Sequence, residues 1–295
     1  MFRALSALAD FSDPVRTWFS RSFASPTRAQ ELGWGPIRAG KSTLLLAPTG
    51  SGKTLAAFLS ALDKLMTTPA GPQGEGLKVL YVSPLKALAV DVERNLRAPI
   101  AGIRAAAANL DVSVREPDVA TRSGDTPVKD RARFQRHGAD LLITTPESLY
   151  LLLTSQAARH FAWLETVIID EIHALLPTKR GAHLFLSLER MEALRQTKEP
   201  LQRIGLSATQ RPLEEAARLL GGSNISTTDD GLLPRPVEIV DARMPPRLHV
   251  EVRAAAPAEV GEAARPLLAT VGEAARPLLA TVGEAARPLL ATVGE

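Results

Sequence analysis

Six short apolar runs, several of them rich in β-branched residues, alternate along this chain with longer segments whose apolar residues recur at helical spacing. The runs are TLLLA (43–47), LKVLYVS (77–83), DVATRS (118–123), DLLITT (140–145), LETVIID (164–170) and QRIGLSA (202–208). Strands that alternate with helices pair in parallel, because a crossover between parallel strands needs a dozen or more residues. The sequence therefore predicts an α/β fold with a doubly wound, mostly parallel sheet, and ligands beyond the carboxyl ends of the strands.

Helices are expected after the first, second and sixth runs, where apolar residues follow the i, i+3, i+4, i+7 rule. The three sets are Leu55, Phe58, Leu59 and Leu62; Leu85, Leu88, Ala89 and Val92; and Leu213, Ala216, Ala217 and Leu220. Hydrophobic residues make up 45% of the chain and aromatic residues only 4%, so we expect a core of Leu, Val, Ile and Ala.

Changes in composition along the sequence divide the chain into three parts. Residues 1–228 are expected to form the α/β domain, and 229–259, which are dense in proline, an exit segment from it. In 260–295 the segment VGEAARPLLAT occurs three times and a fourth copy stops at Glu295. Each copy carries a proline and a glycine that interrupt a continuous helix, so we expect a low-complexity tail of short helical pieces or disorder, without chemistry.

Composition excludes several classes of function. The absence of cysteine removes disulfides, thiol catalysis and cysteine-ligated metals, and five scattered histidines make a metal cage unexpected. The net charge of +3 permits a polyanionic partner without establishing one. No stretch reaches about 20 continuous apolar residues, so no membrane span is expected and the cytoplasm is the expected location.

The segment APTGSGKT, residues 47–54, lies between a predicted buried strand and a predicted helix. This context makes it a phosphate-binding loop, because backbone N–H groups and the positive end of the helix dipole converge there. Gly50 and Gly52 allow backbone angles that other residues disfavour. Lys53 is expected to reach the β and γ phosphates of a nucleotide, and Thr54 to offer its hydroxyl to Mg²⁺. Ala47 replaces the first glycine of the strict pattern and should need no positive φ; the competing interpretation is a glycine-rich turn without a ligand.

An acidic pair follows the buried run TVIID. Asp170 is placed to hold Mg²⁺ through water, and Glu171 is the candidate general base for an attacking water. The competing interpretation is a helix cap. We expect both to lie near Lys53 at one rim of the sheet.

With DEIH the chain resembles the first RecA-like domain of superfamily 2 helicases, the DEAD/DEAH-box group, and is most similar to Lhr-type (large helicase-related) ATP-dependent helicases. The ordered motifs are PTRAQELGW, LLLAPTGSGKTLAAFL, VSPLKALAVDV, RSGDT, TPESLYLLL, DEIHAL and LSAT, within about residues 10 to 250. The resemblance implies a RecA-like phosphate-loop NTPase domain with ATP and Mg²⁺ as cofactors. Its implied ATP-binding residues are Gln30, Thr49, Gly50, Ser51, Gly52, Lys53 and Thr54; Thr54 and Asp170 would hold the metal.

Gln30 matches the adenine-reading glutamine of the family, although a lone glutamine is usually an ordinary surface residue. The family also stacks the base on an upstream aromatic, for which Phe11, Trp18 and Phe19 are open candidates.

The resemblance also implies contacts with one strand of nucleic acid through its phosphates. The matching residues are Ser83, Pro84, Lys86, Ala87, Gly124, Thr145, Pro146 and Glu147. The charged run with Lys129, Arg131, Arg133 and Arg136 is more often a solvated helix face. Ser207, Ala208, Thr209 and His173 would couple the nucleotide state to strand binding.

The family places ATP between two RecA-like domains, and the second supplies arginine fingers. The motifs of that second domain do not occur in this sequence. We therefore expect a truncated or frameshifted reading frame, or a sequence that is part of a longer protein. The predicted function is an ATP-dependent helicase or translocase motor domain that acts on DNA with 3′ to 5′ movement, while RNA or hybrid substrates stay open. This chain alone should bind ATP·Mg²⁺ weakly, hydrolyse it slowly and unwind nothing. The alternative is a non-catalytic, nucleotide-dependent nucleic-acid-binding module.

Overall fold

The computed structural model of this chain describes residues 7–69, 76–209, 212–225 and 231–243. Chain contacts separate one compact unit, Met1–Met244, from a second, Pro245–Glu295. The repeat tail predicted for 260–295 lies outside the described residues.

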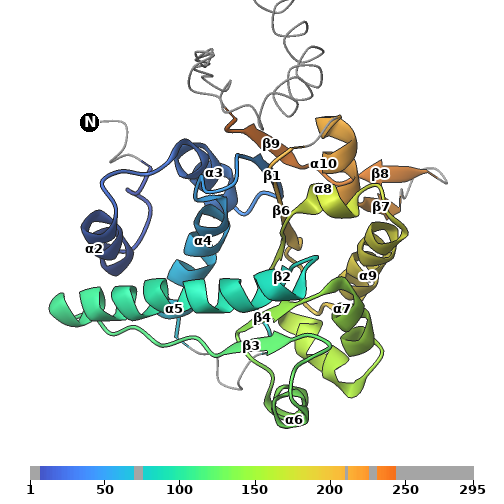
Figure 1. The fold of residues 1–295 in the computed structure, drawn as a ribbon, viewed down its shortest axis with the longest axis horizontal. Helices are drawn as coiled ribbons and strands as arrows, with labels where there is room; N and C mark the ends of the chain where they lie inside the picture. Colours follow the sequence, from blue (N-terminus) through green and yellow to red (C-terminus); the bar gives the residue numbers. More distant parts are fainter. Residues whose placement is uncertain (1–6, 70–75, 210–211, 226–230, 244–295) are drawn as a thin grey trace, which may run out of the picture. The chain divides into compact units, whose positions relative to one another are not determined.

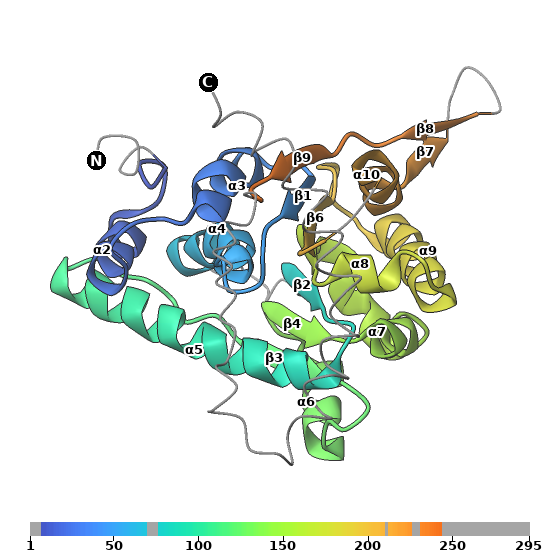
Figure 2. The same ribbon diagram turned by 45° about the horizontal axis from the view of Figure 1, so that its top comes forward.

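Seven parallel strands form the sheet of the first unit (Figures 1 and 2). They are β1 (Thr43–Leu46), β2 (Val79–Val82), β3 (Val119–Arg122), β4 (Leu141–Thr144), β5 (Thr166–Ile169), β6 (Gln202–Ser207) and β9 (Glu238–Asp241). Their order across the sheet is β3-β4-β2-β5-β6-β1-β9, and every neighbouring pair is parallel. The six predicted strands and the predicted α/β class are confirmed.

Helices cover both faces of the sheet (Figures 1 and 2). One face packs against α2 (Asp13–Ser22), α3 (Arg28–Arg38), α4 (Lys53–Thr67) and α5 (Lys86–Asn109). The other packs against α6 (Val128–His137), α7 (Pro146–Leu153), the 3₁₀ helix η1 (Gln156–Trp163), α8 (Ile172–Leu175), α9 (Lys179–Leu194) and α10 (Leu213–Gly221). Strand residues alternate between two hydrophobic clusters: Leu45 belongs to the first, and Leu44 and Leu46 to the second. This alternation explains the continuous apolar runs of the sequence.

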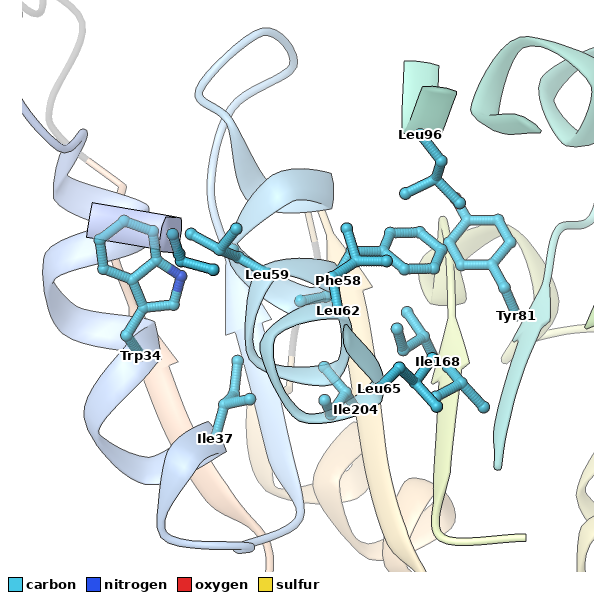
Figure 3. Packing of buried hydrophobic residues seen from close by; sticks show 14 of the residues in the cluster. Trp34, Ile37, Phe58, Leu59, Leu62, Leu65, Tyr81, Leu96, Ile168 and Ile204 are labelled. Atoms are coloured by element: carbon cyan, nitrogen blue, oxygen red, sulfur yellow. The ribbon is translucent and has the colours of Figure 1, made fainter. Parts of the chain in front are cut away.

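Helix α4 carries the centre of the first cluster (Figure 3). Phe58 is fully buried, and its ring stacks on that of Tyr81 with centroids 4.9 Å apart and planes at 27°. Figure 3 shows α4 side chains between those of α3 and those of strands β2, β5 and β6. The helix that follows the phosphate loop is therefore fixed against the sheet by its own apolar face.

Strand β9 extends the domain beyond the boundary at residue 228 that the sequence suggests. The N–H of Glu238 donates to the carbonyl of Ser42, and the N–H of Ala242 to the carbonyl of Leu46, both at 2.8 Å. The compact unit continues to Met244 because this short strand completes the sheet edge beside β1. Prolines on either side of β9 make this strand difficult to recognise in the sequence. A separate antiparallel pair, β7 (Ser223–Ile225) and β8 (Leu232–Pro234), precedes it.

A charged cluster holds the segment leading to β9. Arg203 of β6 is 1% exposed and pairs with Glu189 at 2.8 Å and with Glu192 at 2.9 Å. Arg235 donates to both oxygens of the Glu189 carboxylate at 2.8 Å. The buried guanidinium is thus neutralised, which burial requires.

Among the described residues, no helix combines the length and apolar character needed to cross a membrane. The cytoplasmic location stays a prediction.

We predict that Phe58→Ala lowers the free energy of unfolding by about 3–5 kcal/mol, because it leaves a cavity beneath α4 and removes the ring stack. Urea denaturation measures this. Leu186→Ala, at a position 69% exposed on α9, should change stability by no more than about 0.5 kcal/mol. Equal losses of stability for the two variants would contradict the packing described here.

Candidate active site and nucleic-acid interface

The candidate residues lie along the carboxyl rim of the sheet in two neighbouring groups. Strands β1, β5 and β6 end in the phosphate loop, the acidic pair and the segment Ser207–Thr209. Strands β2, β3 and β4 end at the residues expected to bind nucleic acid. Because all strands are parallel, their carboxyl ends share one rim, as the sequence predicts.

The phosphate loop has the backbone that its glycines suggest. Gly50 and Gly52 adopt φ of +78° and +77°, and Gly52 caps the amino end of α4. The N–H groups of the first turn of a helix have no intrahelical acceptors, so they are available to an anion. Ala47 continues the strand, its N–H donating to Ser207 O at 3.0 Å, and its φ is not positive, which confirms the expectation for that position.

Gln30 is packed against the phosphate loop. It is 3% exposed, its Oε1 accepts from the N–H of Thr27 at 2.9 Å, and its Nε2 lies 3.5 Å from Gly52 O. Thr27 caps α3 and donates its hydroxyl to Ser51 O at 2.7 Å. A Cβ on Gly52 would lie 2.7 Å from Gln30 Nε2 and would displace this amide, and the φ of +77° at Gly52 also favours glycine. The sequence did not single out Thr27 as a contact of the phosphate loop. Its place in the segment PTRAQ, three residues before Gln30, was the available signal.

The three aromatic candidates for base stacking are all buried. Phe11, Trp18 and Phe19 are 3%, 8% and 1% exposed, and Phe11 and Phe19 pack on Trp34. None of the three offers a free ring face here. Phe23, which precedes Thr27, is 42% exposed and was not considered from the sequence.

Lys53 meets the acidic pair across the sheet. Its Nζ lies 3.1 Å from Glu171 Oε1, and Lys53 and Asp170 are each 5% exposed. Asp170 accepts from the hydroxyl of Tyr81 and, at 2.9 Å, from the N–H of Glu171. Glu171 has φ 43° and ψ 44°, an unusual left-handed conformation that costs of order 1 kcal/mol and directs its carboxylate toward Lys53. The predicted neighbourhood of these side chains is present.

Asp170 has no ion-pair partner among the described residues. Burial raises the pKa of Asp170, and the adjacent charge of Glu171 raises it further, against the hydrogen bond from Tyr81, which lowers it. Neutralising such a carboxylate is what a divalent cation would do. No group of three or more His, Asp or Glu side chains within the described part of the chain could hold a metal alone. Mg²⁺ is compatible with so few protein ligands, because it is commonly held by one or two protein groups together with substrate phosphates.

Ser51 supplies a second sign of fit to a triphosphate. Its hydroxyl oxygen is buried and has no hydrogen-bond partner among the described residues. Together with the left-handed glycines and the buried ammonium of Lys53, it forms a donor set suited to phosphate oxygens.

His173 links the acidic pair to β6. Its Nδ1 lies 3.3 Å from Glu171 Oε2 and 3.3 Å from Ser207 Oγ. The hydroxyl of Ser207 also lies 3.3 Å from Thr209 O, and Ala208 lies between these two residues. Of the four residues expected to couple the two groups, His173 contacts the candidate base directly, and Ser207 reaches it through His173.

The carboxyl end of β2 presents Lys86 and the turn before it. Ser83 and Pro84 are buried, and the hydroxyl of Ser83 donates to Leu85 O at 3.0 Å. Lys86 begins α5, with Ala87 in the same turn, and its Nζ lies 3.0 Å from the carboxylate of Asp125. Next to Asp125, Gly124 lies close enough that a Cβ there would be 3.2 Å from Lys86 Nζ.

The carboxyl end of β4 presents the amino end of α7. Thr145 caps this helix by accepting from the N–H of Ser148, and Pro146 is its first residue. Both oxygens of the Glu147 carboxylate accept from Arg180 of α9, whose Nη2 lies 3.0 Å away. These hydrogen bonds lower the pKa of Glu147. No pattern in the sequence singled out Arg180.

Together, the doubly wound sheet and the loop around Lys53 define a RecA-like phosphate-loop nucleotide-binding domain. Residues 27–216 match the family described as DEAD/DEAH box helicase. The chain belongs to this family, and the resemblance to Lhr-type helicases is confirmed by its relatives.

Two curated relatives are the Lhr helicase/probable uracil glycosylase of Mycolicibacterium smegmatis, 54% identical over 220 residues, and the Lhr helicase/uracil glycosylase of Escherichia coli, 46% identical over 256 residues. The alignments cover 75% and 84% of this chain, but only 14% and 15% of the relatives.

The structure of Mycobacterium smegmatis helicase Lhr bound to ssDNA and AMP-PNP is similar, with a TM-score of 0.71 and 52% identity. The match covers 81% of this chain and 28% of that one. Mss116p bound to ssRNA and AMP-PNP, with a TM-score of 0.64 and 15% identity over 81% of this chain and 45% of its own, shares the fold.

We predict that Asp170→Asn stabilises the fold. Because its pKa is raised above the ordinary 3.8, the folded chain binds more protons than the unfolded chain between pH 3.8 and that raised pKa. The free energy of unfolding therefore falls as the pH rises through this window. Asparagine removes the penalty, so Tm at about pH 7.5 should rise, and the gain should disappear as the pH falls toward 4.

Thermal unfolding followed by circular dichroism across this pH range measures the effect. Asp125→Asn, at a carboxylate that is 74% exposed, serves as the control and should change stability little. A lower Tm for Asp170→Asn than for the wild type at about pH 7.5 would contradict the prediction.

Proposed function

We propose that this chain is the ATP-binding motor domain of an Lhr-type helicase, which binds ATP with Mg²⁺ and holds one strand of nucleic acid. The observation that carries the proposal is the contact of Lys53 with Glu171, 3.1 Å apart at the rim although 118 positions separate them in sequence. The contact brings the lysine of the phosphate loop and the candidate base to one point of the rim, and phosphate-loop hydrolysis needs both near the γ-phosphate.

The proposed roles follow the geometry. Lys53 and the loop from Thr49 to Thr54 would bind the triphosphate, with Gln30 toward the adenine. Thr54 and Asp170 would hold Mg²⁺, which when bound neutralises charge on the phosphates. Glu171 would accept the proton of the attacking water.

The contact between Lys53 and Glu171 suggests how hydrolysis is held back without nucleotide. While the ammonium pairs with this carboxylate, one oxygen of Glu171 is occupied and cannot accept a proton from water. A triphosphate in the loop would draw the ammonium to its own oxygens. Glu171 would then be free to orient and deprotonate water.

The nucleic-acid half of the rim is proposed to bind the sugar-phosphate backbone without reading bases. The amino ends of α5 and α7, with Lys86 and Thr145, provide backbone N–H groups, a cation and a hydroxyl. Glu147, held by Arg180, would position that guanidinium rather than touch phosphate itself, because two anions repel. DNA with 3′ to 5′ movement is proposed as the substrate; the solved Lhr structure contains ssDNA, whereas an Arabidopsis relative 34% identical over 185 residues is named an RNA helicase.

Unwinding is proposed to require a second RecA-like domain that closes on the nucleotide and supplies arginines to the γ-phosphate. By itself, this chain should bind ATP·Mg²⁺ weakly and turn it over slowly. The alternative is a non-catalytic module switched by nucleotide, in which Glu171 would keep the pairing with Lys53 that is present in this structure.

We predict that strand-stimulated ATP hydrolysis disappears in Lys53→Ala and falls by about 10²–10⁴ in Glu171→Gln, because the first loses a phosphate ligand and the second a base. Phosphate release with Mg²⁺ and oligo(dT) measures turnover, and calorimetry with AMP-PNP measures binding. Glu171→Gln should still bind AMP-PNP.

Lys64→Ala is the matched control, because Lys64 lies on the same helix as Lys53 but is exposed and pairs with Glu165. It should hydrolyse ATP as the wild type does. Binding of AMP-PNP and strand without any phosphate release from the wild type would establish the module instead, and no heat with ATP and Mg²⁺ would end both proposals.

A further inference from the structure

Two half-buried arginines, Arg122 at the end of β3 and Arg131 in α6, lack an acidic partner in the part of the chain that the structure describes. Within the described residues, neither Arg122 nor Arg131 has a carboxylate partner. Lys129 and Arg136 of the same charged run have none either, but both are exposed to solvent. Arg94 and Arg159 form no salt bridge with a described residue but are likewise exposed, whereas six other cations around these strands are paired: Lys86–Asp125, Arg97–Glu93, Arg104–Glu116, Arg115–Asp140, Arg133–Asp118 and Arg180–Glu147. The pair Arg122–Arg131 therefore differs from the solvated helix face in which the sequence placed Arg131.

Both guanidiniums bond only to carbonyl oxygens of the turn between β3 and α6. Arg122 donates to Ser123 O, and Arg131 to Gly124 O and, at 2.6 Å, to Thr126 O. The turn therefore holds two cations close together and leaves their remaining N–H groups for another acceptor, since a guanidinium has five donors.

Electrostatics agrees with the geometry. Burial lowers the pKa of Arg122, and the charge of Arg131 lowers it further. Asp125 and Asp130 are the nearest acids in sequence; both are exposed, and Asp125 already pairs with Lys86. An anion between the two guanidiniums would relieve their repulsion and could be held through two N–H groups at once.

The pair lies in line with the other candidate contacts on the rim. Arg122 is in register with Thr144 of β4, which is in register with Val82 of β2. The hydroxyl of Thr144 donates to Arg122 O at 2.7 Å, and the carbonyl of Thr144 accepts from Ser83 N–H at 2.9 Å. The ends of β3, β4 and β2 thus form one row, with β3 at its outer end (Figure 1).

We propose that Arg122 and Arg131 form a phosphodiester-binding site, where the sugar-phosphate backbone of the bound strand passes over the outer end of this row. The proposal rests on the proposed function and extends it by a contact on β3. Planar guanidiniums suit bidentate recognition of phosphate. We expect the site to recognise negative charge rather than base sequence, because the two guanidiniums otherwise bond only to backbone carbonyls of the protein.

The test is binding of fluorescein-labelled oligo(dT) to the whole chain, followed by fluorescence anisotropy over a series of salt concentrations. We expect Arg122→Gln to weaken binding roughly tenfold at low salt, because one phosphate of the strand is no longer neutralised. The slope of log K against log salt should then become shallower by about 0.7, the value for a single phosphate of a single strand. Arg122→Lys should keep most of that slope.

Arg133→Gln is the control of equal charge: it lies on the same helix as Arg131 but pairs with Asp118 at 2.8 Å. It should leave the slope nearly unchanged. Arg131→Gln is a second probe with the same expected result as Arg122→Gln, and circular dichroism checks that each variant is folded.

Equal effects of Arg122→Gln and Arg133→Gln, with normal binding by the wild type, would overturn this inference and leave the proposed function intact. A wild type that does not bind oligo(dT) or oligo(rU) would overturn the proposed function and this site with it. Binding of an acidic peptide that displaces no oligonucleotide would assign the pair to a protein partner and also reject the proposal.

Discussion

The ion pair between Lys53 and Glu171 depends on the parallel arrangement of the sheet. Lys53 follows β1 and Glu171 follows β5, with β6 between these strands, so the two side chains can meet only if both strands end at the same rim. Stacking of Phe58 on Tyr81 fixes α4 against β2, and the hydroxyl of Tyr81 reaches Asp170. Tyr81 thus connects the hydrophobic core to the polar site, so a substitution in one should alter the other.

The order of strands separates the two proposed tasks of the rim and also connects them. The candidate nucleotide-binding residues follow β1 and β5, and the candidate strand-binding residues follow β2, β3 and β4. Adjacent strands β5 and β2 form the border between the two groups. His173, within reach of both Glu171 and Ser207, contacts the carboxylate that would change partners when a triphosphate binds. On the other side of this border, Arg180 at the start of α9 holds Glu147 beside the cap of α7.

Local patterns predicted most of the architecture. Buried strands such as β1 and β2 are continuous apolar runs, and the helices after them keep a regular apolar period, so class, strand positions and shared rim were predictable. β9 was not recognised as part of the domain, because its pairing depends on Ser42 and Leu46, nearly two hundred residues earlier, and on the Arg235–Glu189 contact. The similarity of the chain to Lhr-type helicases could also be recognised from the sequence, because each motif is a short continuous segment.

From the sequence alone, local motifs identify the candidate residues: the loop around Lys53, the acids at 170 and 171, and the polar ends of the strands. Only the tertiary structure decided which partners they meet. It paired Lys53 with Glu171 and Glu147 with Arg180, buried Phe11, Trp18 and Phe19, and left Arg122 and Arg131 without an acid among the described residues. The physical reason is that ion pairing and burial depend on distances across the sheet, whereas strand and helix formation depends on neighbours along the chain.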